Sequence, residues 1–249
     1  MVFLDEFKIL QGISILAFVL VTVFVAIRIG LKYFKNREVE YILIGLTWVG
    51  LASPWFPDAI CFVANFFFPG IPYWYLNEIF YLVVGMGFLP LYAVLWLIAL
   101  RKLVYHKKGT HMILINIIIG IIFMVSFFSL LFVDKSHIAS IDPIDVYGTD
   151  LGIIMLLYIP YIITLFFITG LHFTYLTFKS KNPENKLRAK FLFVALISYT
   201  IGALLESVIS ALLPGVIIIT FIAKVILITA SIEFYISFIL PDWVKNVFL

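Results

Sequence analysis

Lys224 and Glu206 are ionisable residues of opposite charge that stand in two consecutive apolar stretches near the end of the chain. A charged side chain inside a membrane is costly, and such residues usually pair with one another or mark a functional site. If the two stretches form adjacent antiparallel helices, the ammonium and the carboxylate can meet. The pair could then join two helices, bind a charged group of a ligand or relay a proton.

Two further carboxylates, those of Asp58 and Glu78, fall at a similar level. With a rise of about 1.5 Å per residue, Lys224 lies about 12 Å, Glu206 about 10 Å and Asp58 about 14 Å below the outer ends of their apolar stretches. Glu78 lies just inside the outer end of its own stretch. We therefore expect all four groups in the outer half of a bilayer.

Helical spacing adds two aromatic residues, because Tyr199 shares a helical face with Glu206 and Trp55 shares one with Asp58. We predict a ligand-binding pocket formed by Lys224, Glu206, Asp58, Glu78, Tyr199 and Trp55. Two plainer interpretations remain open. The Glu206–Lys224 pair could only lock two helices together. Asp58 could instead cap a helix break after Pro57, because proline leaves backbone groups that need partners.

The composition is that of an integral membrane protein. Of the 249 residues, 64% are hydrophobic and 12% are charged, whereas soluble domains carry about 25% charged residues. The single cysteine excludes a disulfide framework within one chain, and the four histidines show no metal-binding spacing. We find no nucleophile–base motif and no phosphate loop, so we expect no enzymatic activity.

Seven stretches reach the length of about 20 mostly apolar residues that a membrane span needs: 9–33, 41–67, 75–100, 111–133, 151–178, 191–213 and 216–240. They lack the alternation of barrel strands, so we predict an all-α fold, a single seven-helix membrane bundle over residues 1–249. Pro54 and Pro57 interrupt the second stretch. Pro90 and Pro160 are expected to kink the third and the fifth.

Nearly all of the 17 Lys and Arg residues follow the first, third and fifth stretches or lie in the C-terminal tail, whereas Lys8 and Lys135 lie on the other side. The positive-inside rule therefore predicts an outer N-terminus and a cytoplasmic C-terminus in a multi-pass protein of the cell membrane. Topology accounts for the basic loops, so we expect no nucleic-acid partner. The N-terminus lacks the features of a cleavable signal, and Trp74 and Trp243 are expected to anchor the bundle at the interfaces.

The basic stretch before the sixth span, KSKNPENKLRAKFLF, and the end of the chain, SIEFYISFILPDWVKNVF, resemble archaeal seven-span membrane proteins similar to the sensor regions of membrane histidine kinases. In those proteins an aromatic-rich seventh span ends at a Pro-x-Trp before a short basic helix. The resemblance implies a sensor or input module in the membrane. It assigns no ligand site.

The tripeptide Ala223-Lys224-Val225 resembles microbial rhodopsins, in which a lysine of the seventh span carries retinal as a Schiff base. The rest of the pattern departs from that family. Thr220 stands where an acid is usual, NEIFYLVVGMGFLPLY lacks an acid-rich motif, and FLFVALISYTIGALLES lacks the expected Trp and Pro. Retinal at Lys224 is therefore the weaker alternative, and we expect no resident cofactor.

These observations favour a non-enzymatic, seven-helix sensor or receptor-like module in the lipid bilayer. It would bind a small or lipidic ligand in the polar outer-half pocket. It would signal to a cytoplasmic or membrane protein partner through its basic loops and C-terminal tail. The alternatives are an ion- or proton-coupled transporter or channel, a retinal protein that uses Lys224, and a structural subunit of a membrane complex.

Overall fold

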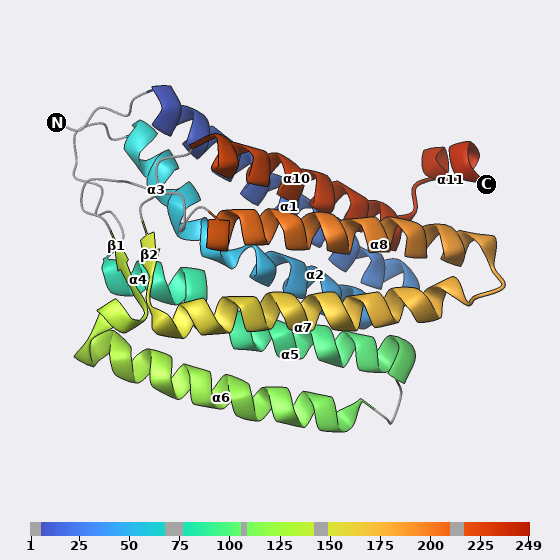
Figure 1. The fold of residues 1–249 in the computed structure, drawn as a ribbon. Helices are drawn as coiled ribbons and strands as arrows, with labels where there is room; N and C mark the ends of the chain where they lie inside the picture. Colours follow the sequence, from blue (N-terminus) through green and yellow to red (C-terminus); the bar gives the residue numbers. More distant parts are fainter. Residues whose placement is uncertain (1–5, 68–76, 106–108, 142–148, 210–216) are drawn as a thin grey trace.

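The computed structural model describes residues 6–67, 77–105, 109–141, 149–209 and 217–249 (Figure 1). Six helical runs are long and apolar enough to cross a membrane, and a seventh span is present if the bent pair Glu40–Leu51 and Ser53–Asn65 is one span. The predicted all-α membrane bundle is thereby confirmed. Trp74, predicted as an interfacial anchor, lies outside the described residues.

The main helices are α1 (Glu6–Asn36), α2 (Glu40–Leu51), α3 (Phe56–Phe67), α4 (Glu78–Leu82), α5 (Leu89–Leu100), α6 (Thr110–Val133), α7 (Ile153–Phe178), α8 (Pro183–Leu204), α10 (Ile217–Ile239) and α11 (Asp242–Phe248). Short 3₁₀ turns form η1 (Ser53–Trp55) and η4 (Lys135–His137), and π turns form η2 (Val83–Gly87), η3 (Arg101–Tyr105) and η5 (Leu205–Ile209). The strands β1 (Ala139–Ile141) and β2 (Thr149–Leu151) pair antiparallel, with Ala139 opposite Leu151.

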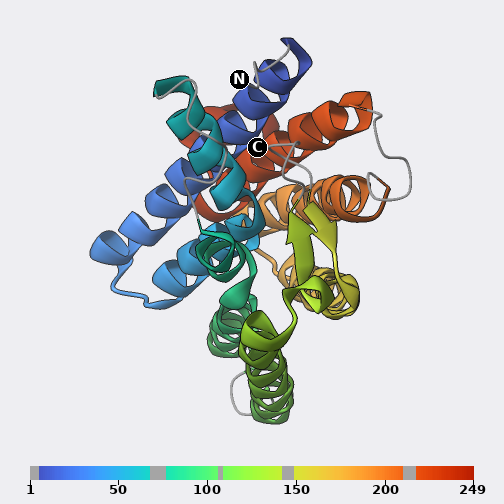
Figure 2. The ribbon, with the colours of Figure 1, turned by 90° about the vertical axis from the view of Figure 1, so that its left-hand side faces the viewer.

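Six spans pack in a ring, in the order α1, α2, α5, α7, α8 and α10, which returns to α1. The helix α6 lies outside this ring against α5 (Figures 1 and 2). It is joined to α7 by a hydrogen bond from the Tyr161 hydroxyl to Asn116 and by the stacked rings of Phe123 and Tyr158. Its other face exposes Ile115, Ile118 and similar residues, as expected for a face that meets lipid.

Trp48 lies at the centre of the ring and contacts three helices besides its own. Its ring stacks on Phe234 of α10 with the centroids 3.8 Å apart, and it lies 5.4 Å from Tyr199 of α8 and 6.2 Å from Phe166 of α7. Only 1% of Trp48 is exposed. Aromatic residues bury large apolar areas, so this cluster holds α2, α7, α8 and α10 together.

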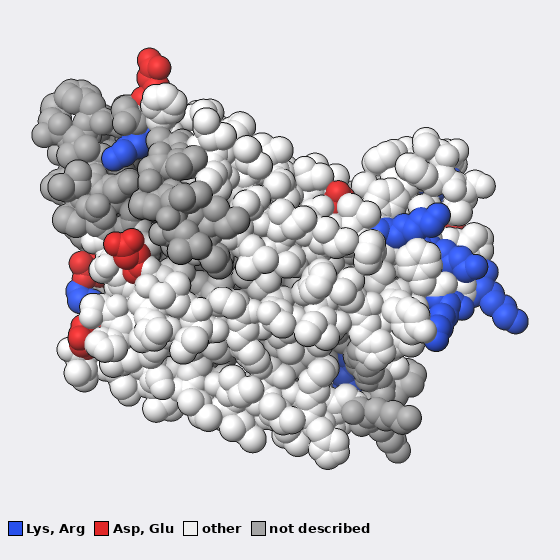
Figure 3. Space-filling view, viewed as in Figure 1, with Lys and Arg blue, Asp and Glu red and all other residues white. Residues whose placement is uncertain are grey.

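The two ends of the bundle differ in charge (Figure 3). Lys and Arg side chains gather where α7 turns into α8 and where α11 lies; we call this the basic end. Asp and Glu side chains are seen at the opposite end, which carries α4 and the β1–β2 hairpin; we call this the acidic end. The helix α1 begins at the acidic end and α11 lies at the basic end (Figure 1).

The turn before the hairpin is held by its own side chains. The Ser136 hydroxyl and backbone N–H donate to the Asp134 carboxylate at 2.6 and 3.1 Å. These hydrogen bonds stabilise the charged form and hold the pKa of Asp134 below its ordinary value. The chain therefore turns tightly between α6 and β1.

One predicted boundary differs clearly from the structure. The helix α8 begins at Pro183, well before residue 191, because Asn182 caps it by accepting a hydrogen bond from the backbone N–H of Glu184 at 2.8 Å. The prediction from hydropathy placed the start of this helix too late, because its first two turns are mainly polar and charged. Pro160 lies inside α7 as predicted. Pro90 lies in the first turn of α5, close after the π turn η2 and within the span Glu78–Val104.

Candidate functional site

The helices α8 and α10 approach each other closely at Gly202. A Cβ atom at this position would lie 2.8 Å from Cγ of Leu227 and 3.3 Å from the carbonyl oxygen of Ala223. The absence of a side chain at Gly202 therefore sets the spacing of the two helices. Glu206 follows about one turn later, in the π turn η5 that continues α8, and Lys224 stands next to Ala223 on α10, so the close approach brings their side chains within reach.

Lys224 and Glu206 form an ion pair, in which Nζ of Lys224 donates to Oε1 of Glu206. The lysine side chain has no exposed surface, and the glutamate side chain is 16% exposed. A charge at such a position is tolerated only with a partner, because desolvation is expensive. The structure thus brings together the two residues whose meeting the sequence suggested.

Trp55 covers the lysine from the side of α1 and α3. Its indole ring lies 5.0 Å from Nζ of Lys224, in cation–π contact, and meets the ring of Phe18 edge-on at 5.1 Å. Trp55 is itself 9% exposed. The ammonium is therefore held between a carboxylate and an aromatic face, which together replace its hydration.

Asp58 joins this group from the first turn of α3. It accepts a hydrogen bond from the Tyr81 hydroxyl, which also lies 3.2 Å from Oγ1 of Thr149 on β2. Asp58 also acts electrostatically on Lys224. A carboxylate in the first helical turn is favoured by the helix dipole as well, so the position of Asp58 fits both interpretations that the sequence left open.

The remaining two predicted residues occupy different places. Glu78 pairs with Lys135 at the acidic end, where both side chains are partly exposed. It therefore stands apart from the Lys224 group. Tyr199 is buried, and its hydroxyl donates to the carbonyl oxygen of Leu51 at 3.2 Å, next to the point where α2 ends.

Three spans leave regular α-helical geometry around this group. The second span bends by 44° at η1, the third contains the π turn η2, and the sixth ends in the π turn η5, which carries Glu206. The hydroxyl of Ser53 in η1 donates to the carbonyl oxygen of Gly85 in η2 at 2.9 Å. Such π turns occur frequently at functional sites. Hydropathy could not reveal them, because it averages over residues and is blind to hydrogen-bond pattern.

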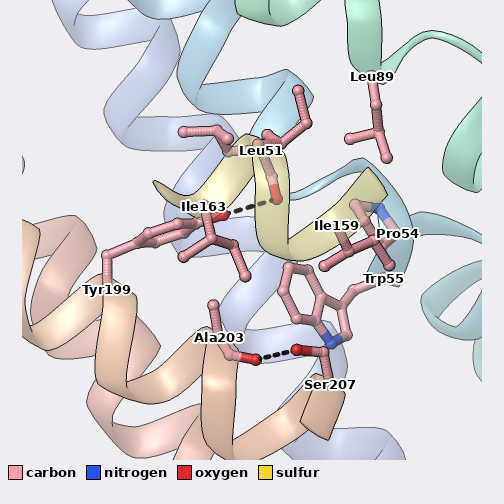
Figure 4. A pocket seen from close by; sticks show the side chains of 10 residues that line it. Leu51, Pro54, Trp55, Leu89, Ile159, Ile163, Tyr199, Ala203 and Ser207 are labelled. Carbon is pink, nitrogen blue, oxygen red and sulfur yellow. Dashed lines mark hydrogen bonds between the residues drawn. The ribbon is translucent and has the colours of Figure 1, made fainter. Parts of the chain in front are cut away.

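A small cavity of about 60 Å³ lies beside these turns (Figure 4). Its walls are mainly apolar and come from α2, η1, α5, α7, α8 and η5. The residues that line it include Leu51, Trp55, Ile163, Tyr199, Ala203 and Ser207. Figure 4 shows the hydroxyl of Ser207 directed to the carbonyl oxygen of Ala203, a distance of 2.7 Å. Trp55 thus lines the cavity and also contacts Lys224, so it stands between the cavity and the ion pair.

Within the described ranges, no three His, Cys, Asp or Glu side chains gather closely enough to hold a metal ion. The arrangement instead offers a buried ion pair, an aromatic wall and an apolar cavity. In comparisons with known proteins, neither a protein-family model nor a curated protein matches this chain.

Proposed function

We propose that this chain is a non-enzymatic sensor or receptor-like module of the cell membrane, which takes a small or lipidic ligand at the cavity beside Trp55. The observation that carries the proposal is the coincidence, at one level, of an apolar cavity, a buried ion pair and irregular turns in three spans.

The volume of the cavity restricts how a ligand could enter. A cavity of about 150 Å³ accommodates benzene, whereas this one measures about 60 Å³. A ligand of more than a few heavy atoms would therefore extend through the opening of the cavity or displace one of its walls. Among the residues of the wall, Trp55 contacts Lys224. Displacement of Trp55 would therefore remove the aromatic face from the ammonium of Lys224. Ligand binding and the strength of the Lys224–Glu206 pair are coupled in this proposal.

The pair α8–α10 would carry the change along the bundle. The two helices are joined near the acidic end by Glu206 and Lys224, and near the basic end by Arg188, which donates to the carbonyl oxygens of Ser237 and Phe238 at 3.1 and 2.6 Å. A shift of α10 at the Glu206–Lys224 pair would therefore change the position of its other end, which Arg188 contacts. In the proposed orientation the basic end is cytoplasmic, so the basic loops and α11 would present the signal to a partner protein.

The test is a ligand screen on the purified protein in lipid nanodiscs, with the unfolding temperature as readout. We expect a ligand that raises this temperature in the wild type and has no such effect on Ala203→Val, which fills the cavity. Ala17→Val, at a partly exposed position of α1, is the matched control. The double variant Lys224→Met/Glu206→Gln should change the ligand-induced shift; identical shifts in all four proteins would refute the proposal.

The same preparations separate the alternatives. Ion or proton flux into proteoliposomes would indicate a transporter. A visible absorption band after expression with retinal, lost in Lys224→Met, would indicate a retinal protein. Neither result is expected from a sensor module.

A further inference from the structure

A second, larger cavity opens at the basic end, on the opposite side of the membrane from the site above. It measures about 380 Å³ and lies among α1, α2, η3, α7, α8 and α10. Small-molecule sites in proteins occupy roughly 300–1,000 Å³, so this cavity is large enough for a ligand. Its lining includes the charged side chains of Lys32, Glu40, Glu184 and Arg188.

Two cations lie side by side in this cavity. Nζ of Lys32 and a terminal guanidinium nitrogen of Arg188 donate to the same oxygen, the carbonyl of Phe238, at 2.8 and 2.6 Å. Each side chain is half-buried. Among the described residues, neither cation has a carboxylate within ion-pair distance. At hydrogen-bond distance the two positive charges therefore meet the partial charges of carbonyl groups at the end of α10.

Both cations retain unused hydrogen-bond donors. An ammonium carries three N–H groups and a guanidinium five. Lys32 makes one hydrogen bond and Arg188 three, to the carbonyl oxygens of residues 237, 238 and 239. Both residues therefore keep free N–H donors after they have capped the last turn of α10. An anion in the cavity could accept from both.

The two acids of the cavity wall, Glu40 and Glu184, each form an ion pair with another lysine. Glu40 lies 3.9 Å from Nζ of Lys102, and Glu184 lies 3.2 Å from Nζ of Lys245 on α11. Neither of these two ion pairs involves Lys32 or Arg188. The second of these contacts also ties α11 to the rim of the cavity, and α11 is docked there by Val244, which is fully buried.

We propose that this cavity binds a phosphate group through Lys32 and Arg188. A guanidinium beside an ammonium matches the multiple acceptor oxygens of phosphate, and charge-assisted hydrogen bonds of this kind are strong. The phosphate can belong to the headgroup of an acidic lipid, since basic pockets between spans bind such headgroups, or to a soluble phosphate compound. Its binding would act on the end of α10, where α11 begins.

The test uses the full chain in nanodiscs of phosphatidylcholine, alone or mixed with phosphatidylglycerol, followed by native mass spectrometry of retained lipid. We expect the wild type to retain phosphatidylglycerol. Lys32→Gln should retain it about tenfold more weakly, because one charge-assisted hydrogen bond is lost. Lys190→Gln, which removes an exposed charge from the same helix as Arg188, should behave like the wild type.

A parallel titration with inorganic phosphate, in nanodiscs of phosphatidylcholine alone, distinguishes the sources. A rise of the unfolding temperature that requires Lys32, without retention of phosphatidylglycerol, would assign the site to a soluble phosphate compound. Arg188→Gln removes three bonds from the end of α10 and could disturb folding, so the decision rests on Lys32→Gln and on the wild type. The proposal is overturned if the wild type shows neither effect, or if Lys190→Gln weakens binding as much as Lys32→Gln does.

Discussion

The indole ring of Trp55 lies 5.0 Å from Nζ of Lys224, and the same ring forms part of the wall of the small cavity. One side chain thus separates an apolar space from a buried ion pair. Because Trp55 comes from the break in the second span and Lys224 from the seventh, the contact also joins two spans that are far apart in the chain.

Substitution of Trp55 should show whether the ring itself is required. Trp55→Leu removes the cation–π contact and part of the packing, and we expect a loss of about 2–4 kcal/mol of stability. Trp55→Phe keeps an aromatic face and should lose less. Unfolding of both variants in nanodiscs measures the difference. Equal losses would show that the ring contributes only volume.

Removal of one partner of the Lys224–Glu206 pair should lower the stability of the protein more than removal of both. Lys224→Met leaves a largely buried carboxylate without its ammonium and should cost about 3–5 kcal/mol. The double variant Lys224→Met/Glu206→Gln should unfold close to the wild type, because no uncompensated charge remains. The control is Lys135→Met, which breaks the exposed pair with Glu78 and should cost under about 1 kcal/mol. Additive losses in the double variant would contradict the pairing.

The close approach of α8 and α10 can be tested at Gly202. Gly202→Ala introduces a methyl group 2.8 Å from Cγ of Leu227, which is fully buried and has little room to move. We expect a loss of about 1–3 kcal/mol from overpacking. Gly30→Ala is the matched control, because a Cβ atom there meets nothing within 4 Å. That variant should be neutral or more stable, since alanine is the better helix former.

The Tyr199 hydroxyl should stabilise the break in the second span. Tyr199→Phe removes its hydrogen bond to the carbonyl oxygen of Leu51, and a loss of about 1 kcal/mol is expected. Tyr175→Phe, at a position that is 57% exposed, serves as the reference. Unfolding temperatures of the two variants that do not differ would show that the hydroxyl has no structural role.

The orientation can be measured by cysteine labelling in intact cells. Cys61 is buried and is the only cysteine in the chain. We expect an impermeant thiol reagent to label Ser140→Cys, an exposed position at the acidic end, without disruption of the membrane. Asn246→Cys, exposed on α11, should react only after permeabilisation. The reverse pattern would invert the proposed topology.

The sequence by itself determined the membrane class, the approximate spans and the charge difference between the two ends. These properties depend on local composition, because about 20 apolar residues suffice to cross a bilayer. It also indicated that Lys224 and Glu206 would meet, since consecutive spans joined by a short connection run antiparallel. Two opposite charges that are buried at the same depth in a membrane are expected to pair with each other.

Only the tertiary structure decided which faces of the helices meet. Glu78 pairs with Lys135 from a distant loop instead of joining Lys224, and Lys32 reaches the end of α10. Hydropathy contains neither these partners nor the packing around Trp48 and the close approach at Gly202. The π turns and the mainly apolar lining of the small cavity likewise arise from hydrogen bonds and contacts between spans. No single stretch of the sequence encodes those contacts.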